Sequence, residues 1–537
     1  MTIGRVLALD HRRVGGAIGA VLAALVALGG MVPVAAAADE FPVGWEGYHT
    51  YAEMVADIHA VADAHPDIVD LFSIGKTYKG RDIWAAKISD NVADDEAEPE
   101  VLFDGLHHAR EHMSLEMTLK ILHWLADGDG VDQRITDIVT SREVWIIFSV
   151  NPDGAEFDIK NGEYHLWRKN RQPTPGSSKI GTDLNRNYDY RWGCCGGSSG
   201  NPANLMYRGW KPFSAPETRA VRDFVESRAV DGWQQIRTHI TFHSNGKLVL
   251  WPYGYTKKNV PSDMSSDDHA AFVAMGKKMA SLNGYRPQQA SDLYITDGRF
   301  GDWIYGTQRV FTYTFEMTVG WYPDDSKIGP ETARNRSAIL YLIEQADCPW
   351  RAAGLAAIDC GAFYDDLELG HGWRPNAQGT DTATDGAWQR GNPQGTSSSG
   401  PKQLGTTYSA SRALVTGLKA GSRPAANDVD GGLTSITSPP IHLPATPGRL
   451  TFRYYLAHNA GSSSADAFRA VVMADDGDHV VLTEKGAARD DDAAWKSASI
   501  DIGAYAGQTI HLRFEAVDGA GANLLEAGVD DVRVRRP

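Results

Sequence analysis

The most informative segment of this chain is Asp104-Gly105-Leu106-His107-His108-Ala109-Arg110-Glu111-His112. It follows an apolar run at 101–103 and precedes residues 113–125, whose apolar side chains are spaced three and four apart. This pattern predicts a strand, a loop and a helix. The imidazole of His108 and the carboxylate of Glu111 are three positions apart, so both can turn toward one metal ion. Zinc favours such a mixed nitrogen and oxygen ligand set, which a distant third ligand would complete.

The segment lies within an alternating pattern over residues 48–348. Strands are predicted at 68–74, 82–88, 101–103, 144–150, 236–242 and 310–315, and helices at 51–64, 113–125, 215–229, 269–282 and 331–345. Such interleaving predicts an α/β fold with a mixed sheet covered by helices on both faces. Ligands of such sheets gather at the carboxyl ends of strands. His108, His243 and Glu316 each follow or end a predicted strand.

The composition changes in the last third of the chain. Residues 363–537 are rich in Gly, Ser, Thr and Asp, with short alternating runs at 450–456, 467–474, 479–483, 496–502 and 509–516. These runs predict an all-β sandwich of the jelly-roll kind. We therefore expect a first domain at 39–350, a linker at 351–362 and a β-sandwich domain at 363–537.

Residues 1–38 have the pattern of an export signal. Arg5, Arg12 and Arg13 precede an apolar run at 14–32, and three alanines at 36–38 offer a cleavage site. A retained membrane anchor is the alternative, since the run is long enough to span a bilayer. The alanine-rich end and the missing basic stop-transfer flank favour cleavage. We expect a secreted protein without a stable membrane anchor.

Charge and cysteine content limit the function classes. The formal net charge is −16 and there is no basic run, so nucleic acid is not an expected partner. Four cysteines allow three disulfide pairings, and an exported protein meets oxidising conditions. Pairing Cys348 with Cys360 would close a short loop and leave Cys194 and Cys195 as a vicinal pair or as two thiols. The sequence leaves the pairing open.

Eight short motifs follow one another along residues 48–348. They are HARE at 108–111, NPDG at 151–154, LWRK at 166–169, DLNRN at 183–187, TFHS at 241–244, WPYG at 251–254, LY at 293–294 and TFE at 314–316. In this order and spacing they resemble the zinc metallocarboxypeptidases of the carboxypeptidase A family, most closely its secreted actinobacterial and carboxypeptidase T-like branch. The resemblance implies the family's eight-stranded type of mixed sheet. It also implies hydrolysis of the C-terminal peptide bond of peptides or proteins.

The resemblance assigns roles in catalysis. It implies that His108, Glu111 and His243 hold one Zn²⁺ ion per chain, which acidifies water and polarises the scissile carbonyl. Glu316 matches the family's general base, which takes a proton from water and passes it to the leaving amine. Arg168 matches the residue that stabilises the oxyanion.

Further residues match the family's substrate contacts. Asn185, Arg186 and Tyr294 match the group that holds the substrate's free C-terminal carboxylate, and Arg110 resembles a secondary contact on the entry path. Asp183 is expected to be structural. Family members that accept basic C-terminal residues carry an acid between the matched tyrosine and a later Asp-Trp pair, whereas this chain has Arg299 there. We expect Arg299 to disfavour basic side chains and to admit acidic ones, unless it points outward.

The C-terminal region carries weaker signals. Acidic residues near its two ends resemble the opening and closing strands of secreted jelly-roll modules, with Glu368 and Asp530 as candidate ligands of a structural Ca²⁺ ion. Turn-capping acids on a solvated surface are the alternative. This region could also bind a carbohydrate or a protein. For the whole chain, the alternatives are a zinc peptidase acting on cell-wall peptides and a secreted binding protein with an inactive peptidase domain.

Overall fold

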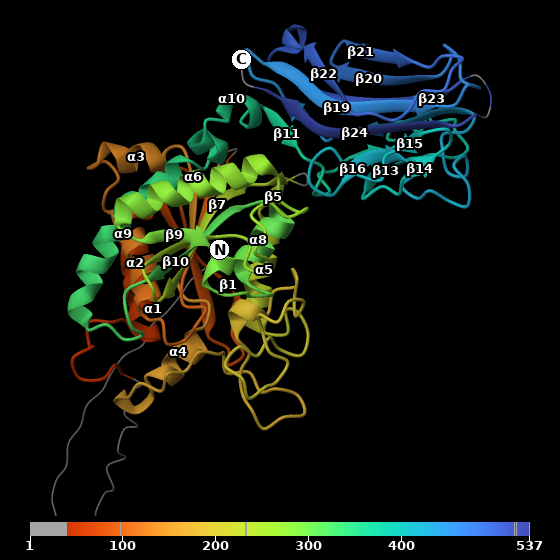
Figure 1. The fold of residues 1–537 in the computed structure, drawn as a ribbon. Coiled ribbons are helices and arrows are strands. Elements are labelled where there is room, and N and C mark those ends of the chain that lie inside the picture. Colours follow the sequence, from red (N-terminus) through yellow and green to blue (C-terminus); the bar gives the residue numbers. More distant parts are fainter. Residues whose placement is uncertain (1–39, 97, 231–232, 520, 522, 536–537) are drawn as a thin grey trace, which may run out of the picture. The chain divides into compact units, whose positions relative to one another are not determined.

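The computed structural model describes residues 40–537 except 97, 231–232, 520, 522 and 536–537 (Figure 1). The predicted signal peptide at 1–38 therefore lies outside the described residues. None of the described helices combines the length and the apolar character that a membrane span requires.

An eight-stranded mixed sheet forms the first part of the described chain. Its order is β1-β2-β4-β3-β7-β10-β8-β9. The strands are β1 (Val69–Lys76), β2 (Asp82–Ile88), β3 (Glu100–Asp104), β4 (Glu143–Ile147), β7 (Ile236–Ser244), β8 (Leu248–Trp251), β9 (Arg286–Gln289) and β10 (Phe311–Met317). The central strands β4, β3, β7 and β10 run parallel, whereas β1, β2 and β8 pair antiparallel with their inner neighbours. The predicted mixed sheet is confirmed.

Helices cover both faces of this sheet (Figure 1). The longer ones are α1 (Tyr51–Ala64), α2 (Met113–Ala126), α5 (Pro216–Ser227), α6 (Ser266–Asn283), α8 (Phe300–Gln308) and α9 (Ile328–Glu344). Successive side chains of a strand point to opposite faces, so Val101 and Phe103 join one hydrophobic cluster and Leu102 joins the other. The first cluster contains residues of α1, α2, α6 and α9, and the second contains residues of α5 and α8.

Local sequence accounts for the start of α1. The side chain of Thr50 accepts a hydrogen bond from the backbone N–H of Glu53, whose own side chain accepts one from the backbone of Thr50. This reciprocal capping box satisfies two backbone donors that would otherwise lack a partner at the helix start. Met54, Ile58 and Val61, spaced four and three apart, are the buried residues of the helix.

Two six-stranded sheets make up most of the region after residue 360. Their shorter strands are β11 (Phe363–Asp365), β12 (Arg374–Pro375), β13 (Trp388–Gly391), β16 (Ala413–Thr416), β17 (Gly432–Thr437), β18 (Ile441–His442) and β22 (Lys496–Asp501). One sheet has the order β13-β16-β24-β19-β22 with β11 beside β24, and the other has β12-β17-β23-β20-β21 with β18 beside β23. Their longest strands are β19 (Arg449–His458), β20 (Ala467–Ala474), β21 (Gly477–Lys485), β23 (Thr509–Asp518) and β24 (Leu525–Val534). Both sheets contribute to one hydrophobic cluster, which contains Phe452 from β19 and Phe468 from β20. An all-β region is therefore confirmed, while its jelly-roll topology and its exact bounds stay predictions.

The cysteines form two disulfides, which settles a question that the sequence left open. Cys348 pairs with Cys360, and Cys194 pairs with its neighbour Cys195. The predicted linker at 351–362 overlaps the short helices η4 (Pro349–Ala353) and α10 (Ala356–Asp359), and the first disulfide spans both.

Candidate active site

The three metal-ligand candidates meet at the carboxyl ends of β3 and β7. His108 and Glu111 lie in the loop after β3, and His243 is the penultimate residue of β7, which pairs in parallel with β3. Nδ1 of His108 lies 2.9 Å from Oε1 of Glu111, and Nδ1 of His243 lies 2.8 Å from Oε2 of Glu111. All three side chains are buried, and their ligand atoms are close enough together to hold one ion. Two imidazoles and one carboxylate fit the ligand preference of Zn²⁺.

Asp183 links this group to Arg168. Its Oδ1 atom lies 3.2 Å from Nε2 of His108, and its Oδ2 atom accepts a hydrogen bond of 2.9 Å from Nε of Arg168. Burial alone would raise the pKa of Asp183, but Arg168, His108 and Arg186 together outweigh burial and hold that pKa well below its ordinary value. An ionised carboxylate on the far ring nitrogen orients a metal-binding histidine. The sequence suggested only a structural role for Asp183, because this contact depends on the tertiary fold.

Glu316 lies on β10 directly beside His243. The two residues are register partners in the parallel pair of β7 and β10. Burial, followed by the charge of Glu111, raises the pKa of Glu316 to about 8. A carboxyl group with a raised pKa can both take up and release a proton near neutral pH. The structure therefore brings the predicted base to the predicted metal ligands.

The predicted carboxylate-binding group is also assembled, although Asn185 and Arg186 have further protein partners. Nη2 of Arg186 donates to Oη of Tyr294 at 3.1 Å, and Tyr294 is 46% exposed, so the pair reaches the solvent-facing side of the site. The side chain of Asn185 donates to Nε2 of His243 at 3.2 Å and accepts from the backbone N–H of Phe300 at 2.9 Å. Asn185 therefore contacts a metal-ligand candidate directly, which the sequence did not indicate.

The two remaining predicted substrate contacts differ in their surroundings. The guanidinium of Arg110 lies over the ring of Trp321, with its carbon 4.0 Å from the ring centre. Arg299 is only 6% exposed, and its Nη2 atom donates to Oγ1 of Thr314 at 2.6 Å. The alternative that Arg299 points outward does not agree with this placement.

Several of these side chains line one cavity of about 230 Å³. Two of the metal-ligand candidates, the predicted base and three arginines line it. Its polar and charged lining includes His108, Glu111, Arg168, Asn185, Arg186, Tyr294, Arg299, Thr314 and Glu316. The site is concave and contains a zinc-type ligand set, a carboxyl group of raised pKa and several arginine side chains. These are the features of a zinc metallopeptidase site.

Comparison with known proteins agrees with this class. A family model described as zinc carboxypeptidase matches residues 54–338. A zinc carboxypeptidase of Saccharothrix mutabilis subsp. capreolus is 45% identical over 320 residues, which are 59% of this chain and 73% of the relative. Carboxypeptidase A1 of Rattus norvegicus is 30% identical over 304 residues, covering 55% of this chain and 70% of the relative.

A solved structure gives the same result. The crystal structure of thrombin activatable fibrinolysis inhibitor matches with a TM-score of 0.51 at 26% identity, and the match covers 56% of this chain and 74% of that chain. The chain belongs to the zinc carboxypeptidase family. It is a metallocarboxypeptidase, an enzyme that acts on the C-termini of peptides or proteins.

The two calcium-ligand candidates lie elsewhere and have protein partners. The carboxylate of Glu368 accepts from the backbone N–H groups of Ser411 and Arg412, and that of Asp530 accepts from those of Tyr408 and Ser409. Neither belongs to a three-residue metal-ligand group found among the described residues. Calcium binding stays a prediction.

Proposed function

We propose that this chain is a secreted, zinc-dependent exopeptidase in which Glu316 is the general base. The observation that supports this most strongly is that His108 and Glu111, which form one metal-ligand group with His243, line the same cavity as Glu316 and Arg186. Secretion rests on the signal pattern at 1–38.

The zinc ligands and Glu316 have different tasks in the proposed hydrolysis. A Zn²⁺ ion held by His108, Glu111 and His243 would supply Lewis acidity toward water and the scissile carbonyl. Glu316 takes the proton of the attacking water and transfers it to the leaving amine. Its raised pKa suits both steps, because the proton is neither held too weakly nor too tightly near neutral pH.

Arg168 and Arg186 provide the positive charges. Nη1 of Arg168 lies 3.9 Å from Oε1 of Glu111, so its guanidinium is beside the ligand group, where it stabilises negative charge that develops on the carbonyl oxygen. Arg186 binds the free C-terminal carboxylate as a planar fork, with Tyr294 beside it. Because only a chain end offers that carboxylate, this arrangement favours release of single residues.

The test compares peptides that differ only at the C-terminus. The full-length zinc-loaded enzyme is given each peptide as a free acid and as its C-terminal amide, with and without a zinc-selective chelator. We expect single-residue release from free acids, loss of activity with chelator and recovery with zinc. Equal cleavage of amides, or cleavage at internal bonds, would contradict the proposal. Release only from cell-wall peptides would favour that substrate class, and no release at all would favour an inactive binding protein.

A further inference from the structure

Arg299 occupies an unusual position at the cavity wall. It is the N-cap residue of α8, and its side chain is buried and lines the cavity. It donates to Thr314, which lies two residues before Glu316 on β10 and therefore on the same face of that strand. The guanidinium is thus fixed on the side of the cavity that also presents the predicted base.

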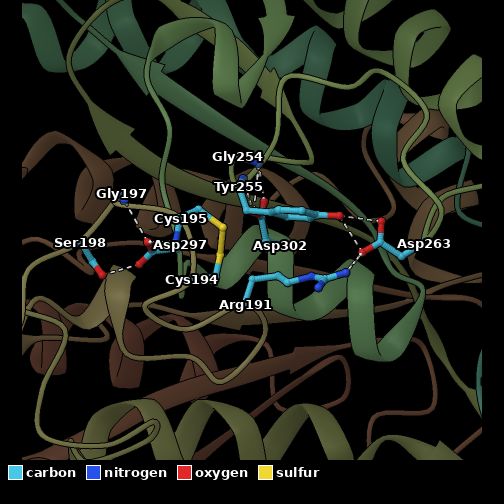
Figure 2. Close-up of a disulfide and its surroundings, with 10 residues drawn as sticks. All are labelled: Arg191, Cys194, Cys195, Gly197, Ser198, Gly254, Tyr255, Asp263, Asp297 and Asp302. Atoms are coloured by element: carbon cyan, nitrogen blue, oxygen red, sulfur yellow. Dashed lines mark hydrogen bonds and ion pairs between the residues drawn. A yellow bond between two sulfur atoms is a disulfide. The ribbon is translucent and has the colours of Figure 1, made fainter.

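The acids that lie closest to Arg299 in the chain have other partners. Asp297 accepts from the backbone N–H groups of Cys195 and Gly197 at 3.2 and 2.9 Å and from the hydroxyl of Ser198. Figure 2 shows Asp297 beside the Cys194–Cys195 disulfide, and Asp302 at the backbone of Gly254 and Tyr255.

The carboxylate of Asp302, like that of Asp297, accepts hydrogen bonds from backbone N–H groups. Both of its carboxylate oxygens accept from the N–H of Gly254 at 2.9 Å, and one also accepts from Tyr255 at 3.0 Å. Asp302 influences Arg299 through its charge, yet no carboxylate of the described residues hydrogen-bonds the Arg299 guanidinium. A buried guanidinium with one neutral hydroxyl partner keeps unused donors, and such a charge gains from an anionic partner.

The local backbone also favours an anion and leaves room for one. Arg299 lies at the N-terminal end of the nine-residue α8, where the helix dipole is positive. Residue 301 is glycine, and a Cβ atom there would lie 3.6 Å from Nη2 of Arg299, so glycine leaves this side of the guanidinium uncovered. Burial lowers the pKa of Arg299, but arginine stays protonated at neutral pH.

We propose that Arg299 makes the enzyme selective for C-terminal Glu and Asp. This rests on the exopeptidase function proposed above. Arg186 binds the α-carboxylate, and Arg299 binds the side-chain carboxylate of the same residue, so an acidic C-terminal residue meets two guanidinium groups. A basic side chain would place a like charge in the same cavity, which disfavours binding.

The test uses the full-length zinc-loaded enzyme and peptides that end in Glu, Asp, Gln, Leu or Arg. Gln has almost the shape of Glu and lacks only its charge, so the ratio of kcat/KM for Glu to that for Gln isolates the charge. We expect this ratio to be at least about tenfold in the wild type, because hydrogen bonds between charged groups in a buried site are strong. The peptide ending in Arg is expected to be the poorest substrate.

Two variants test whether Arg299 causes the preference for C-terminal Glu over Gln. Arg299→Gln should bring the Glu to Gln ratio close to one, and Arg299→Lys should restore part of it by returning the charge without the planar fork. Arg286→Gln is the matched control, because it makes the same charge change on the exposed start of β9 and should leave the ratio unchanged. A ratio taken within one enzyme is insensitive to general loss of activity, and thermal unfolding reports whether each variant is folded.

The outcomes separate this inference from the function on which it rests. Release of Leu and Gln without any advantage for Glu, or a Glu to Gln ratio that survives Arg299→Gln, would overturn the selectivity and leave the exopeptidase intact. If none of the free-acid peptides is cleaved, the exopeptidase proposal fails and the selectivity fails with it.

Discussion

Glu111 and Glu316 line one cavity, and their pKa values are shifted in opposite directions. Burial opposes ionisation of both, but His108 and His243 hold the pKa of Glu111 below its ordinary value. The pKa of Glu316 is instead raised to about 8. Environments that separate two carboxyl groups in this way assign them different tasks. Glu111 is suited to bind a cation, and Glu316 is suited to move a proton.

Glu316→Gln is expected to lower kcat by about 10²–10⁴-fold, because it removes the general base. In the wild type, kcat/KM should fall as the pH falls through the pKa of Glu316, since only the ionised carboxylate accepts a proton. A divalent cation close by lowers such a pKa, so the midpoint of this acid limb should lie below about 8. The measurement is the pH dependence of kcat/KM, with zinc content determined for each protein.

The exposed Glu163 provides the control for this variant. Glu163→Gln should keep both the rate and the acid limb. A Glu316→Gln protein that is zinc-loaded, active and unchanged in its pH profile would refute the assignment of the base.

At the residue scale, the sequence predicts the groups that its motifs contain and misses their tertiary partners. His108, His243 and Glu316 could be predicted because each follows or ends a predicted strand, and Glu111 because it belongs, like them, to a motif that resembles the zinc carboxypeptidases. The contacts of Asp183 with His108, and of Asn185 with His243, join segments that are far apart in the sequence. No periodicity or spacing reports such contacts, so only the fold identifies both residues as positioning groups.

At the scale of elements, the site depends on a short loop that the Cys194–Cys195 disulfide belongs to. The backbone carbonyl of Gly197 in this loop accepts from Nε of Arg186, and its N–H donates to Asp297. Asp297 in turn lies between Tyr294 and Arg299 in the sequence. One buried carboxylate therefore connects the loop that contacts Arg186 with the segment that carries two other cavity residues.

Asp297→Ala is expected to raise KM for free-acid peptides more than it lowers kcat, because Arg186 and Tyr294 bind the substrate while Glu316 lies on another element. The change also leaves the buried N–H of Gly197 without its acceptor, which should lower the free energy of unfolding by about 1–3 kcal/mol. Steady-state kinetics and chemical denaturation measure the two effects. Asp70→Ala, at an exposed position of β1, is the control. A pure kcat effect would contradict a positioning role.

The sequence predicts the long elements well and the short ones near the cavity poorly. Strands such as β3 and β10 could be predicted because they are continuous runs of apolar and β-branched residues. The strand β9, Arg286–Gln289, has no apolar alternation and obtains its conformation from pairing with β8. The helix α8 starts at Phe300, and its N-cap residue Arg299 makes no side-chain capping hydrogen bond, so no local signal marks its beginning. Tertiary packing therefore determines the conformation of β9 and the beginning of α8.

At the scale of the whole molecule, the described residues contain separate hydrophobic cores. Two clusters flank the eight-stranded sheet, and a third lies between the two all-β sheets. The zinc-ligand candidates belong to the first part alone, whereas Glu368 and Asp530 belong to the second. Binding of an ion stabilises only the folded unit that contains its site. Zinc should therefore stabilise the first part and not the second.

We predict that calorimetry of the full chain shows two unfolding transitions and that a zinc-selective chelator lowers the Tm of only one. The stabilisation that zinc provides is about 4 kcal/mol when free zinc exceeds its Kd about 1,000-fold, so the shift should be readily measured. His243→Ala should lower the same Tm and make it insensitive to the chelator. Added Ca²⁺ should raise the other Tm if Glu368 and Asp530 bind it. Loss of both transitions together on chelation would show that residues 39–350 and 363–537 unfold as one cooperative unit, and would refute the proposed division into domains.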